Sequence, residues 1–288
     1  MKFVVLMENT APEGACLSAE AGLSLYIEHR GHKLLLDAGS SGKFADNAAA
    51  LGIDLSQVEL AVLSHGHYDH SDGLRRFFAA NQRAKVYART GAGGPYFSTS
   101  QGSPRFIGVH RDIWEGFRDR FVLSDALSQP MEGVWLELLE GGWLLPDGPK
   151  DPAFMGKASN LVCKRGEDDF VPDDFSHEQS LVLEGERGLV VFNSCSHGGI
   201  VNIVQGVRDQ LQKPVYAVVG GLHMFSASHP SGMNCAPEYA RGVADALLEQ
   251  GVERVYTGHC TGAYAYERLA AILGQRLRPL TGGSVAEI

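Results

Sequence analysis

Four potential metal ligands lie within six consecutive residues, directly after an apolar run at 60–63. They are His65, His67, Asp69 and His70, with a glycine between the first two. Neutral imidazole and carboxylate groups are ligands for zinc and for its borderline neighbours manganese and iron. Because a turn that leaves a strand can direct alternate side chains to two nearby points, we expect His65 and His67 to bind one ion and Asp69 and His70 a second. The alternative is a polar surface turn, which this density of ligands disfavours.

Two more histidines follow apolar runs later in the chain, where the remaining ligands are expected. His197 stands in the turn 194–199 and His259 in the turn 256–262, each after a strand-like segment. A turn of small residues at the end of a strand is a rigid place from which to present a ligand. Either histidine alone could simply cap a loop, but together with the first cluster they indicate a metal centre.

The elements that must position these residues alternate between strand-like and helix-like patterns. Strands are expected at 1–7, 23–27, 33–37, 60–63, 179–184, 188–193, 215–219, 254–256 and 278–280, and helices at 43–51, 72–80, 199–211, 237–250 and 263–273. Residues from about 90 to 175 hold the three tryptophans and much of the proline, and we expect loops and short strands there that wall a pocket. The pattern predicts an α/β fold with one domain over 1–288 and a loop-rich insertion at about 90–175.

Composition and charge disfavour several classes of protein. Of the 288 residues, 44% are hydrophobic and 20% charged, which is typical of a globular chain. The formal net charge of −9, with no basic run, disfavours nucleic acid and anionic membranes as partners. No segment approaches the roughly 20 apolar residues that span a bilayer, and five widely spaced cysteines without a CxxC pair suit a reduced chain. We therefore expect a cytoplasmic protein with a small-molecule substrate.

Four motifs in this sequence resemble those of the metallo-β-lactamase superfamily. They are LSHGHYDH at 63–70, CSHGGI at 195–200, GGLH at 220–223 and GHCTG at 258–262. The first is specific for the superfamily, and the other three resemble the branch labelled 7,8-dihydropterin-6-yl-methyl-4-(β-D-ribofuranosyl)aminobenzene 5'-phosphate synthase. The resemblance implies an αββα sandwich of mixed sheets covered by helices, with a dinuclear centre along one edge of the sheets. It also implies two ligand sets, His65, His67 and His197 for the first site and Asp69, His70 and His259 for the second.

The sequence departs from the superfamily pattern at one ligand. Most members supply a metal-bridging aspartate after the strand that here is expected at 215–219, whereas this chain continues into Gly220-Gly221-Leu222-His223. His223 is then either a direct ligand of the second site or a group that hydrogen-bonds the substrate. Without the aspartate, a water or hydroxide is left to bridge the ions.

The resemblance implies a metal-dependent hydrolase in which a metal-bound hydroxide attacks an ester, lactone, thioester or phosphoester. Two divalent ions are the expected cofactors, zinc first, with manganese or iron as alternatives. Asp69 would orient the water, and His223 would donate to the oxyanion or the leaving group. The branch label instead implies a transferase, in which a ribosyl-aminobenzene phosphate displaces pyrophosphate from a dihydropterin. A metal-binding module without catalysis is a third alternative.

Several other residues near these motifs have two readings each. His177 and Glu178, before the strand expected at 179–184, resemble a branch motif and are expected to contact the substrate. Asp37 could hold a ligand histidine through a hydrogen bond or simply end a strand. Cys195 and Cys260 flank ligand histidines, and we interpret them as small buried spacers rather than as thiolate ligands. The helix expected after 199 offers N–H groups to a phosphate oxygen, so the substrate could be phosphorylated.

Overall fold

The computed structural model describes residues 1–125, 128–131, 134–138, 151–154, 160–227 and 229–288. The chain forms two compact units. Unit 1 comprises Met1–Asp125, Leu161–Asp173 and Thr281–Ile288, and unit 2 comprises Ala126–Asn160 and Asp174–Leu280. The single domain expected over 1–288 stays a prediction. Within the described residues, no helix is long and apolar enough to cross a membrane.

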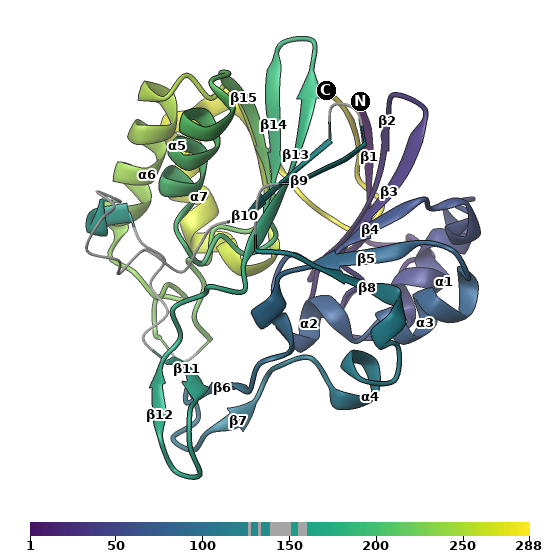
Figure 1. The fold of residues 1–288 in the computed structure, drawn as a ribbon. Helices are drawn as coiled ribbons and strands as arrows, with labels where there is room; N and C mark the ends of the chain where they lie inside the picture. Colours follow the sequence, from purple (N-terminus) through teal and green to yellow (C-terminus); the bar gives the residue numbers. More distant parts are fainter. Residues whose placement is uncertain (126–127, 132–133, 139–150, 155–159, 228) are drawn as a thin grey trace. The chain divides into compact units, whose positions relative to one another are not determined.

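Unit 1 contains a mixed sheet of seven strands in the order β18-β1-β2-β3-β4-β5-β8 (Figure 1). The strands are β1 (Lys2–Met7), β2 (Ser24–His29), β3 (His32–Leu36), β4 (Leu60–Val62), β5 (Lys85–Ala88), β8 (Phe121–Leu123) and β18 (Val285–Glu287). β18, β1, β2 and β3 pair antiparallel, whereas β3, β4, β5 and β8 pair in parallel. Because parallel strands end at the same edge of a sheet, the turns after β3 and β4 are neighbours.

Short helices pack on one face of the unit 1 sheet. They are α1 (Lys43–Ala50), α2 (Tyr68–Ser71), α3 (Leu74–Ala80) and α4 (Arg111–Trp114), with 3₁₀ turns η1 (Leu55–Gln57), η2 (Thr90–Gly93) and η3 (Arg118–Arg120). Phe44 of α1 and Phe77 of α3 join the buried cluster that includes Leu35 and Ala61 of the sheet. Each buried phenylalanine contributes roughly 1.5–3 kcal/mol, so this packing anchors the strands that carry the first ligand cluster.

Unit 1 also holds a small antiparallel sheet of four strands in the order β12-β11-β6-β7. Its members are β6 (Tyr96–Ser98), β7 (Arg105–Phe106), β11 (Leu161–Lys164) and β12 (Phe170–Pro172). The ring of Phe97 contacts those of Phe106 and Phe170 at centroid distances of 5.5 and 5.2 Å. The described part of the segment 90–175 thus contains the expected loops and short strands, while 139–150 and 155–159 lie outside the described residues.

Unit 2 contains a second mixed sheet of seven strands in the order β17-β16-β15-β14-β13-β10-β9 (Figure 1). The strands are β9 (Ser128–Met131), β10 (Val134–Leu138), β13 (Gln179–Gly185), β14 (Gly188–Phe192), β15 (Val215–Val219), β16 (Arg254–Thr257) and β17 (Leu277–Pro279). β14 to β17 are parallel neighbours, whereas β13 forms an antiparallel hairpin with β14. Therefore the turns after β14, β15 and β16 lie along one edge of this sheet.

Three helices cover one face of the unit 2 sheet, where Figure 1 shows them together beside β13–β15. They are α5 (Ile200–Leu211), α6 (Pro237–Glu249) and α7 (Ala263–Leu273), with 3₁₀ turns η5 (Pro152–Phe154), η6 (His259–Thr261) and η7 (Gly274–Arg276). Ile203 of α5, Val243 of α6 and Leu269 of α7 share one buried cluster with Val191 and Val218 of the sheet. This packing fixes the strand ends from which the second group of ligands extends.

Both hairpins and most of the expected elements are confirmed. Three details differ from the sequence analysis. The strand β5 (Lys85–Ala88) was not among the expected strands. A separate short helix, α2, begins at Tyr68 inside the ligand cluster, before α3. The chain also ends in β18, which was not expected because its three residues carry no apolar run and are ordered by pairing with β1.

Candidate metal centre

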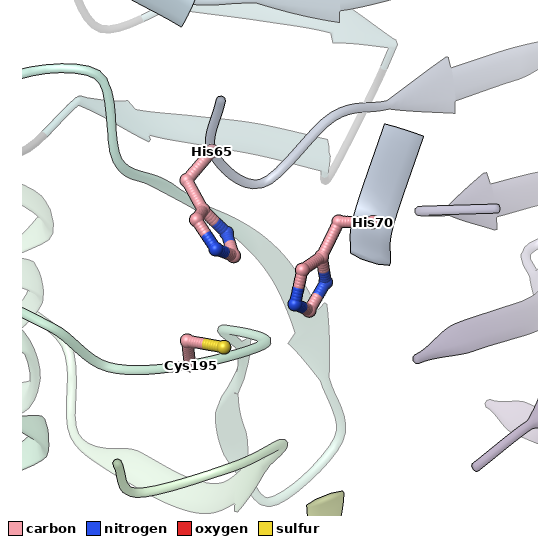
Figure 2. Close-up of side chains that lie close together, drawn as sticks. All are labelled: His65, His70 and Cys195. Carbon is pink, nitrogen blue, oxygen red and sulfur yellow. The ribbon is translucent and has the colours of Figure 1, made fainter. Parts of the chain in front are cut away.

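The first ligand cluster of unit 1 occupies the turn between β4 and α2. His67 is the N-cap of α2, so the first turn of that helix carries Asp69 and His70. The ring of His65 lies 4.5 Å from that of His67 and 4.2 Å from that of His70, centroid to centroid. Figure 2 shows His65 and His70 side by side, one from the turn and one from the helix. The three histidines are buried, and the Asp69 side chain is 23% exposed.

Asp37, at the end of β3, is the buried acceptor that organises this cluster. Its Oδ1 accepts the N–H of Ser64 at 2.7 Å, and its Oδ2 accepts the Ser64 hydroxyl at 2.6 Å. The same Oδ2 lies 2.7 Å from Nδ1 of His70. The Ser64 hydroxyl proton points to Asp37, so its oxygen accepts from Nδ1 of His65 at 2.8 Å. Asp37 therefore hydrogen-bonds the expected ligand His70, whereas its role in supporting a metal ligand stays a prediction.

These hydrogen bonds determine which ring nitrogen carries each proton. His70 donates its Nδ1–H directly to the carboxylate of Asp37. His65 donates its Nδ1–H to the hydroxyl of Ser64, which in turn donates to the same carboxylate. The lone pair of each neutral ring then resides on Nε2, which is the arrangement that metal-ligating histidines show when a carboxylate holds the other nitrogen. The Nε2 atom of His70 lies 3.6 Å from a carboxylate oxygen of Asp69. The donor set in unit 1 thus fits a divalent ion.

His197 of unit 2 lies in the turn between β14 and α5 and is held from two sides. Its ring stacks on Phe175 at 4.3 Å with an interplanar angle of 1°. Two carboxylate oxygens of Glu178 accept the backbone N–H groups of His197 and Gly198, at 2.8 and 2.9 Å. Glu178 therefore shapes the turn that presents His197, and its expected contact with a substrate, like that of the buried His177, stays a prediction.

Burial raises the pKa of Glu178 to about 7, and the two N–H donors and the histidines at 177 and 223 lower it only in part. An acid whose pKa is raised on folding stabilises the folded state below its unfolded pKa, near 4.5, and that stability is lost as pH rises to the folded pKa. For the metal-free protein we therefore expect ionisation of Glu178 to lower the free energy of unfolding by about 3 kcal/mol as the pH rises from 4.5 to about 7.

The measurement is urea unfolding of the metal-free parent and of the Glu178→Gln variant across this pH range. The parent should lose stability relative to the variant as pH rises, with Glu186→Gln on the exposed hairpin turn behaving as the parent does. Parallel curves for the parent and Glu178→Gln would show that the carboxyl group ionises normally in the fold.

The turns after β15 and β16 are joined by two threonine hydroxyls. Thr257 donates to the carbonyl oxygen of Gly220 at 2.7 Å, and the two hydroxyl oxygens of Thr257 and Thr261 lie 2.6 Å apart. Thr261 also accepts the N–H of Leu222 at 2.9 Å. This network fixes the GGLH turn beside η6, the 3₁₀ turn that begins at His259. Sequence analysis named the histidines of these turns but not the threonines that hold them.

His223 lies among unit 2 residues that carry sulfur and imidazole groups. Its ring is 4.3 Å from the ring of His197, and its backbone N–H donates to Sγ of Cys260 at 3.3 Å. Burial raises the pKa of the Cys260 thiol, but hydrogen bonding with Cys195 and the neighbouring His259 and His223 leave that pKa well below its usual value.

Backbone strain is concentrated at the residues of these turns. Seven non-glycine residues of the described chain have positive φ, and two of them, Arg30 and Gln212, lie at a hairpin turn and a helix end. The other five lie in or beside the ligand-bearing turns and are Asp37, Phe175, Ser196, His223 and His259. Such conformations cost of order 1–3 kcal/mol each and cluster at functional sites. The strain therefore supports a functional role for both groups of turns.

Within unit 1 the structure brings together His65, His67, Asp69 and His70, and within unit 2 it places His197 beside His223. Sequence reasoning missed Ser64 and Phe175. Ser64 adjoins the first histidine and its hydroxyl was a visible signal, whereas Phe175 lies 22 positions before His197 in a segment without a motif. The complete ligand sets implied by the resemblance stay predictions.

Comparison with known proteins relates this chain to one superfamily. The family model of the metallo-beta-lactamase superfamily matches residues 17–209. A Methanocaldococcus jannaschii protein named 7,8-dihydropterin-6-methyl-4-(beta-D-ribofuranosyl)-aminobenzene-5'-phosphate synthase is 27% identical over 277 residues, with 91% of this chain and 88% of that protein covered. An uncharacterised protein of the same organism, MJ0448, is 25% identical, with 93% of each chain covered.

Solved structures show the same relationship. The crystal structure of Tm1679, a metal-dependent hydrolase of the beta-lactamase superfamily, has a TM-score of 0.78 and 25% identity, covering 100% of this chain and 99% of that one. The metallo-beta-lactamase fold protein YhfI from Bacillus subtilis has a TM-score of 0.57 and 12% identity, with 99% of each chain covered, and shows the fold alone. The predicted fold class is thereby confirmed.

Proposed function

Because the chain belongs to the metallo-beta-lactamase superfamily, we propose that it is a metal-dependent hydrolase acting on a small-molecule substrate. The proposed ligands of the first ion are His65, His67 and His197. The proposed ligands of the second are Asp69, His70 and His259. Zinc is the proposed ion at both sites, with manganese or iron as alternatives, because imidazole and carboxylate ligands suit all three.

The observation that carries this proposal is the hydrogen-bond network of Asp37. One buried carboxylate orients two histidines, His70 directly and His65 through Ser64, so that both have the lone pair on Nε2. In a polar surface turn these four polar groups would be hydrogen-bonded to water, whereas here they are buried and bonded to one another. Conversely, a metal site needs such support, because the partners of the ligands set ring orientation and basicity.

When bound, the two ions would supply an activated water and would polarise the bond under attack. The chain itself contributes the orientation of the reacting groups. Asp69, partly exposed at the first turn of α2, is proposed to accept a hydrogen bond from the attacking water. His223, beside His197, is proposed to donate a hydrogen bond to the oxyanion or the leaving group. The substrate bond is then an ester, lactone, thioester or phosphoester.

Metal analysis of protein purified without added metal tests this proposal. We expect the double variant with His67→Ala and His197→Ala to contain about two equivalents of metal fewer than the parent and to lose hydrolysis across a panel of esters, lactones, thioesters and phosphoesters. The control is His32→Ala, an exposed histidine paired with Glu59 in unit 1, which should keep both metal and activity. Hydrolysis that survives the double change would refute the proposal.

One observation favours a second candidate function, a transferase. The relative named as a dihydropterin–ribofuranosylaminobenzene phosphate synthase covers nearly the whole chain, although at 27% identity. The same ligands would serve this reaction, since it also needs an electrophilic metal. Release of pyrophosphate from a dihydropterin pyrophosphate, dependent on added ribofuranosylaminobenzene phosphate, would establish the transferase. A metal-loaded parent that turns over neither class of substrate would instead indicate a binding module.

A further inference from the structure

Three turns of unit 2 bring two thiols and an imidazole together. Cys195 follows β14, His223 follows β15 and Cys260 lies in η6 after β16. One ligand atom from each lies within 4.8 Å of the other two. Cys195 is 3% exposed, and Cys260 and His223 are partly buried. This group, here called the thiol–histidine cluster, shares no residue with the ligand sets of the proposed hydrolase.

Backbone hydrogen bonds hold the three turns against one another. The N–H of Gly221 donates to the carbonyl oxygen of Ser194 at 2.8 Å, which joins the first turn to the second. The N–H of His223 donates to Sγ of Cys260, and the Cys260 thiol lies 3.7 Å from the carbonyl oxygen of Cys195. The cluster is therefore built into the sheet edge and does not depend on one mobile loop.

The backbone makes room for the sulfur of Cys260. A Cβ atom at Gly221 would lie 2.4 Å from that sulfur, closer than real Cβ atoms approach a heavy atom. Glycine at this position thus permits the approach of Cys260 to the GGLH turn. The interpretation of both cysteines as spacers stays a prediction, and the closeness of two thiols to an imidazole allows a second role.

We propose that Cys195, His223 and Cys260 bind a single thiophilic divalent cation, such as zinc or cadmium. Zinc bonds of about 2.3 Å to sulfur and about 2.0 Å to nitrogen place tetrahedral ligand atoms roughly 3.5–3.8 Å apart. The three atoms already lie within 4.8 Å, so small side-chain rotations complete the site. Two thiolates balance the charge of the ion, and their two protons leave to solvent.

The Nδ1 atom of His223 is the ligating nitrogen in this proposal. It is buried and has no hydrogen-bond partner among the residues that the structure describes. Binding through Nδ1 keeps the proton on Nε2, so the donor role proposed for His223 is compatible with this site. Two cysteines and one histidine leave a fourth position open, as in zinc sites that exchange a water. The site needs residues of unit 2 alone and does not rest on the proposed hydrolase.

Cobalt(II) substitution of the full-length, reduced protein tests the proposal. Thiolate ligands give cobalt an intense charge-transfer absorption in the near ultraviolet, which imidazole and carboxylate ligands do not. We expect this band in the parent and in the His65→Ala and His67→Ala double variant, which disables only the unit 1 cluster. The band should disappear in the double variant with Cys195→Ser and Cys260→Ser. In His223→Ala, cobalt should bind the two thiolates at least about 10-fold more weakly, as measured by titration of the band.

The matched control is Cys235→Ser, a partly buried cysteine of unit 2 outside the cluster, which should keep the band. Cadmium-113 NMR of the unsubstituted parent is a second measurement that needs no variant, because the chemical shift moves downfield with each sulfur ligand. A parent without the cobalt band, a band that persists when both cysteines are replaced, or a cadmium spectrum without any resonance shifted by sulfur ligands would each overturn the proposal. A parent that shows the band but hydrolyses none of the panel substrates would count against the hydrolase and not against this site.

Discussion

Replacing Asp37 by asparagine is expected to lower the metal affinity of the protein by about 10–100-fold while the chain stays folded. Asparagine tolerates the positive φ of 55° at this position, and its carbonyl oxygen can still accept the N–H of Ser64. Its amide group, however, presents hydrogens where Oδ2 now accepts from the Ser64 hydroxyl and faces Nδ1 of His70. Both histidines then lose the hydrogen bonds that direct Nε2 toward a metal ion.

Competition with a chromophoric zinc chelator measures this change, and urea unfolding of the metal-free protein checks the fold. The control is Asp54→Asn, because Asp54 is the N-cap of η1 outside the cluster and asparagine caps equally well. Asp37→Ala should go further and cost about 3–5 kcal/mol of unfolding free energy, since it leaves buried donors unpaired. Unchanged zinc affinity in Asp37→Asn would mean that the network does not support metal binding.

Substituting alanine for Gly66, between the first two histidines, is expected to disrupt the cluster by steric conflict alone. An added Cβ would lie 2.2 Å from the carbonyl oxygen of Ala92 and 2.9 Å from its carbon, so the backbone must move. Overpacking of this kind costs typically 1–3 kcal/mol, and more where the backbone cannot yield. Because His65 and His67 flank the displaced residue, we also expect metal content to fall by at least one equivalent relative to the parent.

Thermal unfolding and metal analysis of the Gly66→Ala variant check both expectations. Gly242→Ala provides the matched control, since this glycine lies inside α6 and its added Cβ would make only an ordinary 3.7 Å contact with Phe154. There, alanine should stabilise the helix by up to about 1 kcal/mol. A Gly66→Ala protein with parental stability and metal content would show that the turn is more adaptable than the packing indicates.

Sequence patterns were sufficient for the features that depend on neighbouring residues. Period and composition predicted the helix at 43–51 and the two hairpins, because burial of one face of a helix or strand shows directly in local spacing. The cluster HGHYDH stood out because four ligands lie within one turn. The strand ends that carry His197 and His259 followed from apolar runs that stop at small residues.

Contacts between distant parts of the chain required the tertiary structure. Ser64 and His70 bind an aspartate 27 and 33 positions away, and Glu178 reaches the N–H groups of residues 19 and 20 positions later. No local pattern reports such pairs, since they arise where parallel strands end at a common edge. The same edge brings Cys195, His223 and Cys260 together from three turns. The sequence by itself thus determined the candidate ligands and the turns that carry them, whereas the fold decided which nitrogen of His65 and of His70 carries its proton and which residues meet, because both depend on long-range packing.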